Sequence, residues 1–426
     1  MMTSRRHFLK NTGLAALALP FIQFDSSKDW SIRSLKYSSA EGDAYWAQVR
    51  KQFPLKEGQT YFNNGTMGPT PGYVLDKMIH HMIHYNTEAA TIDYKDGSGP
   101  ELLSGYFPYV ELREKLGRIV NCDYKELSLT QNATIGMNLV GQGLDLKAGD
   151  ELINTNQEHG GGFGVWQLLA KRKGCIYKQA IMPEPANDPQ AIIDAIFKQV
   201  TPKTKVIAVP HIISGYGTVM PVKAICTEAK RRGIFTVLDG AQCVGHVKVD
   251  VKTIGCDAYY SSLHKWLLAP PGSGLLYINK NVVGNIWSTI ASYNWDNQDD
   301  HGFRLMQHGT GSPYQMTGYE AAVDFYNTIG EERWLARIHE LGSYLRNGLK
   351  QLPHVTIHSS TNESMAAGIT TYAVKGISGP DLQKTMWERE RLQPRSVGEN
   401  LLRHSVHIYN SKTEIDKALN LIAQLG

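Results

Sequence analysis

Two neighbouring stretches decide the fold: "TVLDGAQCVGH" (residues 236–246) and "DAYYSSLHKWLLAPPGSGLLYI" (residues 257–278). Asp239 stands at the end of a short apolar run typical of a strand, and Lys265 stands at the end of the next such run. In open parallel sheets, ligands bind at the carboxyl ends of the strands. The two stretches therefore predict that Asp239 and Lys265 lie together in a ligand site.

An aspartate and a lysine in this arrangement suit one class of cofactor. A lysine amine forms a Schiff base with an aldehyde, and burial makes the amine nucleophilic near neutral pH. A carboxylate beside a pyridine nitrogen favours the protonated ring. Pyridoxal 5'-phosphate carries both groups and stabilises a carbanion at the α-carbon of an amino acid. The pattern indicates a pyridoxal-phosphate enzyme with Lys265 and Asp239 as catalytic residues.

A phosphate cradle is predicted in "LTQNATIGMN" (residues 129–138), where Ala133 and Thr134 begin a helix after a strand. Free backbone N–H groups and the helix dipole favour an anion there. Ser262 and His264, just before the lysine, could add a hydroxyl and a ring N–H. Taken singly, Thr134 could be only a helix cap and His264 only a core histidine, so the prediction depends on the whole set.

The surrounding sequence alternates short apolar runs with amphipathic helical stretches from about residue 125 to 280. This alternation predicts an α/β fold, with a mostly parallel sheet flanked by helices. Both chain ends are expected to form a smaller α+β domain. The predicted segments are a signal (1–25), an N-terminal arm that joins the small domain (26–75), a large cofactor-binding domain (76–318) and a C-terminal small domain (319–426).

The stretch "QEHGGGFGVW" (residues 157–166) raises a different possibility, because His-Gly-Gly-Gly can form the oxyanion hole of an esterase. Such a hole works beside a GxSxG nucleophile elbow, and the sequence contains no GxSxG. A hydrolase is therefore not favoured. The glycines instead let the backbone pass close to a ligand.

A metal site is a weaker alternative. His80 and His84 have the i, i+4 spacing of ligands on one helix face, but no HExxH glutamate accompanies them. The five cysteines are odd in number and form no CxxC pair, so neither a disulfide framework nor a zinc cage is predicted. The formal net charge is +4 with scattered basic residues, which is not the pattern of a nucleic-acid-binding protein.

The N-terminus, "TSRRHFLKNTGLAALALPFIQF" (residues 3–24), has Arg5 and Arg6 before a short apolar run. The run is too short for a stable membrane span. The segment resembles a twin-arginine signal, and a chance pair of arginines before a buried helix is the alternative. We expect export by the twin-arginine route to the periplasm, with the segment either cleaved or kept as an anchor, and no other membrane span.

From about residue 45 onward, the chain resembles the class V aminotransferase family of pyridoxal-phosphate fold type I. The nearest branch is that of isopenicillin-N epimerases and cysteine desulfurases, with "HKWLLAPPGSGLLYI" closest to the epimerases. The motifs that carry the resemblance are "NNGTMGP" (63–69), "NATIGMN" (132–138), "EH" (158–159), "LDGAQ" (238–242), "SLHKW" (262–266), "HGTGSP" (308–313) and "LLRHSVHIYN" (401–410).

The resemblance implies a role for each cofactor-binding residue. Lys265 would form the Schiff base and then move the α proton. Asp239 would pair with the pyridinium nitrogen, Gln242 would hydrogen-bond the ring hydroxyl, and His159 would stack on the ring. The predicted phosphate ligands are Ala133, Thr134, Ser262 and His264.

The resemblance also implies a homodimer with shared sites, in which Thr310 reaches the phosphate of the neighbouring subunit. Arg403 would bind the carboxylate of a small amino-acid substrate by a bidentate pair; a surface salt bridge is the alternative for this residue. Arg391 and Arg395 are candidates for an acidic group on the substrate side chain, or else belong to a solvated basic loop.

Two departures from the family pattern bear on function. Ser214 stands where many relatives carry a side-chain amide, which puts that contact to the ring hydroxyl in doubt. Desulfurases carry a nucleophilic cysteine before the carboxylate-binding arginine, whereas no cysteine follows Cys256 here. Epimerisation, transamination and β-elimination remain open, as does a non-catalytic protein that keeps the fold for binding.

Overall fold

The computed structural model describes residues 30–91 and 106–426. The predicted twin-arginine segment, residues 1–25, lies outside the described residues. The described residues from Ile32 onward belong to one compact unit. Within the described ranges, no helix has both the length and the apolar character needed to cross a membrane.

The larger sheet has seven strands in the order β2-β8-β7-β6-β5-β3-β4. The consecutive pairs from β7 to β4 are all parallel, whereas β8 runs antiparallel to both of its neighbours, β2 and β7. This mostly parallel sheet confirms the predicted α/β class. The strands are β2 (Leu127–Thr130), β3 (Glu151–Thr155), β4 (Ile176–Ala180), β5 (Thr204–Pro210), β6 (Phe235–Asp239), β7 (Ala258–Ser262) and β8 (Gly274–Ile278).

Strand β5 shows why this sheet is stable. Ile207 and Val209 belong to one hydrophobic core, and Val206 and Ala208 belong to another. Successive side chains of a strand point to opposite faces, so both faces of the sheet are buried. Continuous apolar runs, rather than alternating ones, are what such a strand requires.

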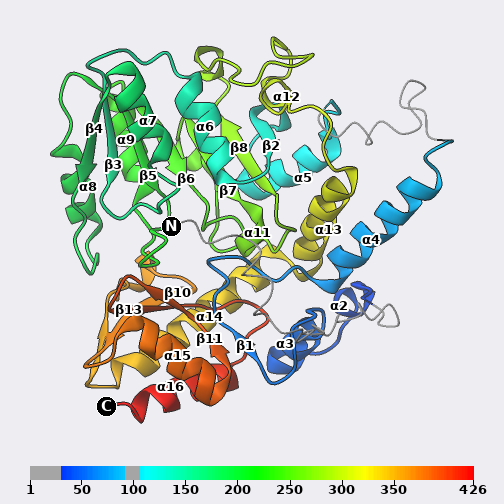
Figure 1. The fold of residues 1–426 in the computed structure, drawn as a ribbon, viewed down its shortest axis with the longest axis vertical. Coiled ribbons are helices and arrows are strands. Elements are labelled where there is room, and N and C mark those ends of the chain that lie inside the picture. Colours follow the sequence, from blue (N-terminus) through cyan, green and yellow to red (C-terminus); the bar gives the residue numbers. More distant parts are fainter. Residues whose placement is uncertain (1–29, 92–105) are drawn as a thin grey trace, which may run out of the picture. The chain divides into compact units, whose positions relative to one another are not determined.

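Helices cover both faces of the sheet (Figure 1). Residues of α6 and α7 enter one core, and residues of α8 and α9 enter the other. Each of these helices follows a strand, which is the alternation that the sequence predicts. Their bounds are α6 (Ala133–Gly143), α7 (Gly164–Lys173), α8 (Pro189–Phe197) and α9 (Val222–Arg231).

The smaller sheet has four antiparallel strands in the order β12-β13-β10-β9. Its core also contains residues of the helices that follow the large sheet in sequence. The elements are β9 (Val355–Ile357), β10 (Ile369–Val374), β12 (Arg395–Val397), β13 (Leu401–Ser405), α14 (Glu331–Lys350), α15 (Gly379–Glu390) and α16 (Lys412–Ala423).

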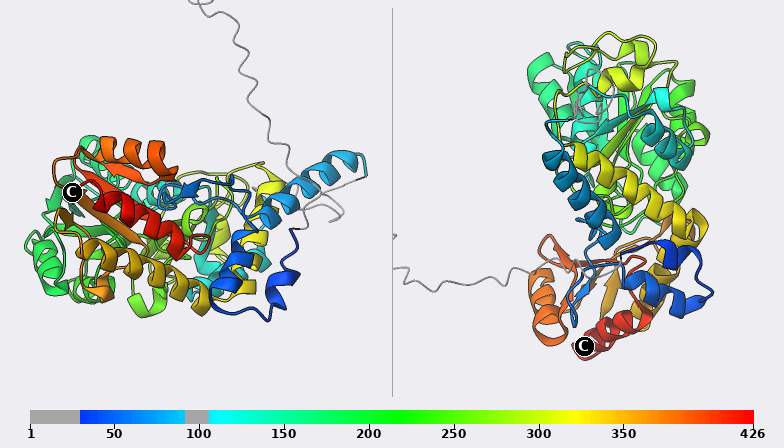
Figure 2. Two further views of the ribbon diagram at one scale, coloured as in Figure 1. Left: turned by 90° about the horizontal axis from the view of Figure 1, so that it is seen from below. Right: turned by 90° about the vertical axis from the view of Figure 1, so that its right-hand side faces the viewer.

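A segment near the N-terminus pairs with a segment near the C-terminus in a separate two-stranded sheet. β1 (Thr60–Tyr61) runs parallel to β11 (Leu392–Gln393). The predicted boundary between residues 318 and 319 falls inside α13 (Pro313–Ile329), which packs on α4 (Gly72–Thr87). The domain limits therefore stay predictions. Helices α13 and α14 connect the region of the large sheet with that of the small sheet (Figure 2).

The two histidines considered as a metal site lie on α4. His80 and His84 lie exposed on α4, and His80 contacts Asp76. Within the described ranges, no group of three or more metal-ligating side chains comes together.

The remaining elements are α2 (Arg33–Lys36), α3 (Gly42–Arg50), α5 (Val110–Val120), α10 (Val251–Ile254), α11 (Leu263–Trp266), α12 (His301–Leu305), η2 (Tyr124–Glu126), η3 (Val283–Asn285) and η4 (Glu363–Met365).

Candidate active site

A cavity of about 690 Å³ opens at the carboxyl ends of the large sheet. Its walls come from the segments after β2, β3, β5, β6 and β7, together with residues 65–66 and the β12–β13 hairpin. Ligand pockets typically measure roughly 300–1,000 Å³. The cavity is therefore large enough for a cofactor and a substrate.

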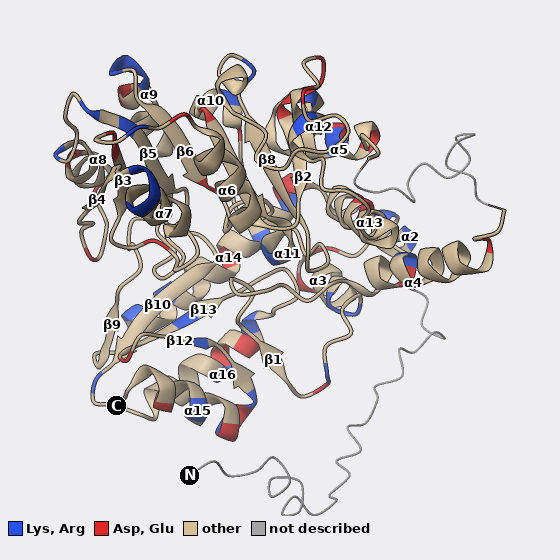
Figure 3. Cartoon of the chain, turned by 45° about the horizontal axis from the view of Figure 1, so that its top comes forward, with Lys and Arg blue, Asp and Glu red and all other residues tan. Residues whose placement is uncertain are grey.

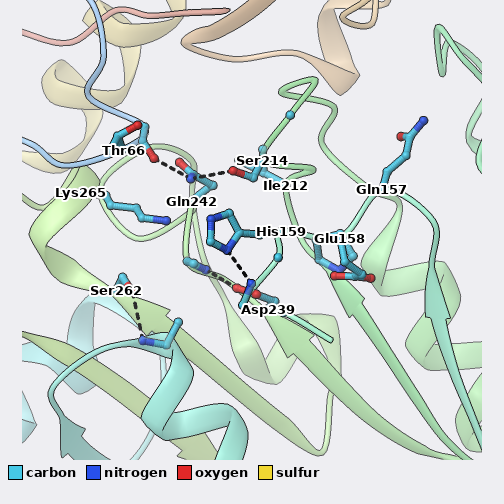
Figure 4. A pocket seen from close by; sticks show the side chains of 18 of the residues that line it. Thr66, Gln157, Glu158, His159, Ile212, Ser214, Asp239, Gln242, Ser262 and Lys265 are labelled. Carbon is cyan, nitrogen blue, oxygen red and sulfur yellow. Dashed lines mark hydrogen bonds between the residues drawn. The ribbon is translucent and has the colours of Figure 1, made fainter. Parts of the chain in front are cut away.

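Lys265 lies on α11, directly after β7, and its side chain extends toward His159 (Figure 4). Burial lowers the pKa of the Lys265 amine to about 8, and Asp239 opposes this change. The Asn64 amide donates to the Lys265 carbonyl at 3.2 Å, which ties α11 to the N-terminal segment. The backbone of Lys265 is thus anchored, and its amine is partly unprotonated near neutral pH, as a nucleophile must be.

Asp239 is the last residue of β6, and its Oδ1 accepts from the Ala241 N–H at 2.8 Å. Burial raises the pKa of its carboxyl group, while the Ala241 N–H and Lys265 lower it. A cationic partner would stabilise the ionised form further. Asp239 can therefore hold a protonated nitrogen in this cavity.

His159 follows β3 and lies above Asp239 in the view of Figure 4. Its Nδ1 accepts from the Gly161 N–H at 3.1 Å. Burial lowers the pKa of the imidazole, and Lys265 acts in the same direction. The neutral ring therefore carries its proton on Nε2, and its exposed face can cover a flat ligand.

Glu158 has no predicted role, although it belongs to the "EH" motif. Its Oε1 accepts from the Thr155 N–H at 3.1 Å and from the Thr155 hydroxyl at 3.0 Å. Burial raises the pKa of its carboxyl group to about 8, and the Asp239 charge acts in the same direction. Near neutral pH, Glu158 is therefore largely protonated.

Gly162 separates these two carboxyl groups. A Cβ atom built on it would lie 3.2 Å from the His159 carbonyl oxygen and 3.3 Å from both Asp239 Oδ2 and Glu158 Oε2. Any side chain here would crowd the cavity floor, which explains the glycine. Trp166, at the end of the same stretch, is fully buried in the core.

The predicted phosphate cradle lies at the N-terminus of α6. Ser262 Oγ accepts from the Ala133 N–H at 3.0 Å, and Thr134 lines the cavity with its side chain exposed. His264 Nδ1 contacts the Ser273 carbonyl at 3.3 Å, so its other nitrogen donates only when the ring is protonated. A bound anion would favour that protonated form.

Gln242 also lines the cavity, but its amide is engaged. Nε2 donates to the Gly65 carbonyl at 2.8 Å and to Ser214 Oγ at 3.2 Å. Oε1 accepts from Trp266 Nε1 at 2.7 Å. Its bond to a ring hydroxyl stays a prediction, and it would require Gln242 to share or release one of these contacts.

Arg403 lies opposite Arg395 in the β12–β13 pairing, and both arginines line the cavity. Both guanidinium groups donate to Thr66 Oγ1, at 3.1 Å from Arg403 and 2.8 Å from Arg395. Arg403 is only 4% exposed, and its Nε has no hydrogen-bond partner among the described residues. Burial lowers the pKa of Arg403 to about 10, with Arg395 acting in the same direction.

Like charges directly across a strand pair are destabilising. Figure 3 shows basic residues on this hairpin, and the ionisable groups that act most on Arg403 are Arg395 and Tyr61 rather than a carboxylate. The positive charge of the paired arginines therefore suits an anion.

The structure does not bring two of the predicted residues into the cavity. Thr310 is exposed outside it, where a second subunit would have to provide its partner. Arg391 ends α15 and lies over the Trp387 ring at 5.5 Å, away from the cavity. Of the two loop arginines, only Arg395 lines the site.

Sequence patterns also miss several lining residues, among them Thr66, Glu184 and Tyr216. Thr66 and Arg395 are 329 residues apart in the chain. Only the tertiary fold brings them together, and neither belongs to a local motif with a chemical role. The "NNGTMGP" motif identifies the segment that contains Thr66, but it does not predict the contact of Thr66 with Arg395.

None of the five cysteines lines the cavity. Burial raises the pKa of Cys122 and of Cys226 to about 12, and it raises those of Cys175, Cys243 and Cys256. The thiolate is the reactive form of cysteine. The structure therefore offers no activated thiol beside Lys265.

Comparison with known proteins gives a consistent family. The family model "Aminotransferase class-V" matches residues 60–418. Isopenicillin N epimerase of Amycolatopsis lactamdurans is 28% identical over 402 residues, covering 89% of this chain and 98% of the relative. A probable cysteine desulfurase of Xylella fastidiosa is 27% identical over 404 residues, covering 87% and 93%.

Solved structures agree. A mutant of C-DES with glycine covalently linked to its pyridoxal-phosphate cofactor is similar with a TM-score of 0.78 and 26% identity, covering 88% of this chain and 99% of that one. The cystine C–S lyase C-DES with its product cysteine persulfide gives a TM-score of 0.77 at 26% identity, covering 87% and 99%.

Proposed function

The chain belongs to the class-V aminotransferase family, and from this premise we propose that it is a pyridoxal-phosphate-dependent enzyme acting at the α-carbon of a small amino-acid substrate. The observation that carries the proposal is the meeting of Lys265, Asp239 and Arg403 in one cavity. A lysine, a carboxylate and an arginine are the groups needed for an aldehyde, a pyridinium and a substrate carboxylate.

The residues present fit the cofactor. The N-terminus of α6, with Ser262 at 3.0 Å from the Ala133 N–H, suits a phosphate. Gly162 leaves free the space between Asp239 and Glu158 that a Cβ would crowd. When bound, pyridoxal phosphate supplies an electron sink for the α-carbon.

The protein's own groups do the rest. Arg403 holds the substrate carboxylate with a planar, charge-assisted pair of hydrogen bonds. The Lys265 amine, with its pKa lowered to about 8 mainly by burial, can accept the α proton and return it. His159 covers the ring, and Asp239 keeps the ring nitrogen protonated.

The reaction that we favour is epimerase- or aminotransferase-like. Both begin with removal of the α proton and differ in where it returns. A β-elimination lyase is the alternative, and the solved cystine C–S lyase supports it. The buried cysteines disfavour a persulfide carried on the protein.

The test of the enzyme class is spectroscopic. Protein supplied with pyridoxal phosphate should show a visible absorption band that borohydride converts into a covalent adduct on Lys265. Protein that stays colourless would refute the proposal. A coloured protein that turns over no amino acid would instead support the non-catalytic binding alternative.

The reaction type is tested by products formed from an amino-acid panel in deuterated water. Solvent label at the α-carbon with loss of chirality indicates an epimerase. A keto acid formed together with the amine form of the cofactor indicates an aminotransferase. Ammonia and pyruvate indicate a lyase.

We also propose a homodimer with shared sites. Thr310 is exposed outside the cavity, which suits a contact to a second copy. Large apolar side chains are exposed nearby in sequence, with Trp287 66% and Tyr293 85% accessible. Light scattering should give a dimer mass, and Thr310→Ala should weaken cofactor binding; a monomer that binds the cofactor tightly would contradict sharing.

Export to the periplasm by the twin-arginine route is part of the same proposal, and Arg5 and Arg6 carry it. That route would suit a protein that binds its cofactor before export. Replacing both arginines by lysine should keep the protein in the cytoplasm. Unchanged fractionation of the doubly substituted protein would exclude this route.

A further inference from the structure

The outer wall of the cavity carries two charged groups that the chemistry at Lys265 does not use. Glu184 follows β4, and Arg395 begins β12. Both line the same cavity as Lys265 and Arg403. The side chain of a substrate bound to Lys265 and Arg403 would therefore share its cavity with both charged groups.

Glu184 is held in place by side chains from two other segments. His358 Nδ1 contacts Glu184 Oε1 at 2.7 Å. The Tyr216 hydroxyl hydrogen-bonds Glu184; burial raises the pKa of that hydroxyl to about 12, with Glu184 acting in the same direction. The Glu184 side chain is still 36% exposed and faces the cavity. A fixed carboxylate of this kind recognises an ammonium group or another N–H donor.

Arg395 adds a positive charge that an α-carboxylate alone does not balance. It pairs across the strands with Arg403, and the two guanidinium groups share Thr66 Oγ1. One carboxylate satisfies one arginine in a bidentate pair. The second arginine is therefore available to a second carboxylate, on the substrate side chain.

We propose that Arg395 and Glu184 form a side-chain subsite for a distal carboxylate and a distal ammonium or N–H donor. This inference rests on the proposed function and narrows its substrate class. The class is amino acids whose side chain ends in a second zwitterionic head, such as diamino dicarboxylic acids. The cavity reaches from the N-terminus of α6 to Glu184, so one ligand can contact both ends.

The experiment compares ligands that carry both distal groups, one of them, or neither. The probes are diaminopimelate, 2-aminoadipate, lysine and norleucine, titrated into the cofactor-loaded protein. Binding is measured by the change in cofactor absorbance and independently by calorimetry. Diaminopimelate should bind at least ~10-fold more tightly than either ligand with one distal group, and norleucine should bind most weakly.

Two variants assign the distal groups. Glu184→Gln should reduce the preference for diaminopimelate over 2-aminoadipate by ~10-fold. Arg395→Gln should reduce its preference over lysine by a similar factor. His358→Asn is the matched control, because it breaks the contact to Glu184 but keeps the carboxylate, so the preference should survive.

The outcomes separate this inference from the proposed function. Equal binding of norleucine and diaminopimelate would overturn the subsite. The subsite would also be overturned if Glu184→Gln and His358→Asn weakened the binding of all four ligands by the same factor. That result would mean that Glu184 has a structural role. If a panel that also includes small amino acids leaves the cofactor spectrum unchanged, the proposed function itself fails.

Discussion

One side of the cavity, formed by the ends of β3, β6 and β7 and the start of α6, takes its polar groups from residues 130–265. We call this the cofactor side. The other side, the substrate side, joins Thr66 to Arg395 and Arg403 across more than three hundred residues of chain. The cofactor side consists of strand ends on a sheet that is buried on both faces.

The two sides also differ in charge. On the cofactor side, Lys265 faces Asp239, and Glu158 is largely protonated near neutral pH. On the substrate side, two guanidinium groups lie on adjacent strands. Under the proposed function, the reaction chemistry and the choice of substrate belong to separate parts of the chain, so we expect substitutions to affect them separately.

The largest expected effect comes from Lys265→Ala. Turnover should fall by at least ~10³-fold, because the variant loses both the nucleophile and the proton carrier. Circular dichroism should show an unchanged fold. Lys280→Ala, an exposed lysine after β8, is the control and should retain full activity. Full-rate turnover by Lys265→Ala would contradict the assignment of the reaction chemistry to the cofactor side.

Arg403→Lys tests the substrate side. The KM for the amino-acid substrate should rise by roughly 10- to 100-fold, because a lysine cannot replace the bidentate, charge-assisted pair. The dissociation constant of the cofactor should change far less, since Arg403 Nη2 donates to Thr66 on the substrate side. Arg391→Lys, outside the cavity, should change neither constant. A weaker cofactor with an unchanged KM would contradict the division into two sides.

Gly162→Ala tests the cofactor side by crowding it. The added methyl group would lie 3.2–3.3 Å from the His159 carbonyl, Asp239 and Glu158. Overpacking typically costs about 1–3 kcal/mol, so cofactor affinity should fall by ~10-fold. Gly160→Ala is the matched control, because no atom lies within 4 Å of the position that its methyl group would take. Equal affinities of the two variants would show that the floor can adjust.

The smallest effect concerns Glu158 and pH. Its pKa is raised from 4.5 in the unfolded chain to about 8 in the folded protein, mainly by burial. The folded state therefore binds the extra proton, and this contribution to stability is lost as pH rises from about 4.5 to 8. The Glu158→Gln variant carries an amide that is neutral at every pH, so it does not show this loss of stability.

The melting temperature is the measurement for Glu158. The difference between Glu158→Gln and the unsubstituted protein should shift in favour of the variant by ~2 °C between pH 5.5 and pH 8.5. A difference that is constant across this range would mean that Glu158 is ionised throughout.

The cofactor side was largely predictable from sequence for a physical reason. Asp239, Ser262 and Lys265 follow apolar strands, and strand ends in a parallel sheet gather at one edge. The resemblance added His159 and Arg403, which the structure also places in the cavity. The roles of these residues stay predictions until they are tested.

The substrate side was predictable only in part. Glu184 and Tyr216 lie in loops whose positions depend on tertiary packing, and Arg391 was as good a candidate as Arg395 from sequence. The strand register separates the two arginines, because it pairs Arg395 with Arg403 and leaves Arg391 at the end of α15. Sequence patterns do not report that register.

The parallel pairing of β1 with β11 has a consequence for the order of folding during synthesis. Thr66, in the loop after β1, cannot meet Arg395 until 329 more residues have been made. At ~5–20 residues per second, this delay is roughly 15 to 65 s. The strands of the cofactor side are therefore already synthesised when the ribosome reaches Arg395, so the substrate side can be completed only near the end of synthesis.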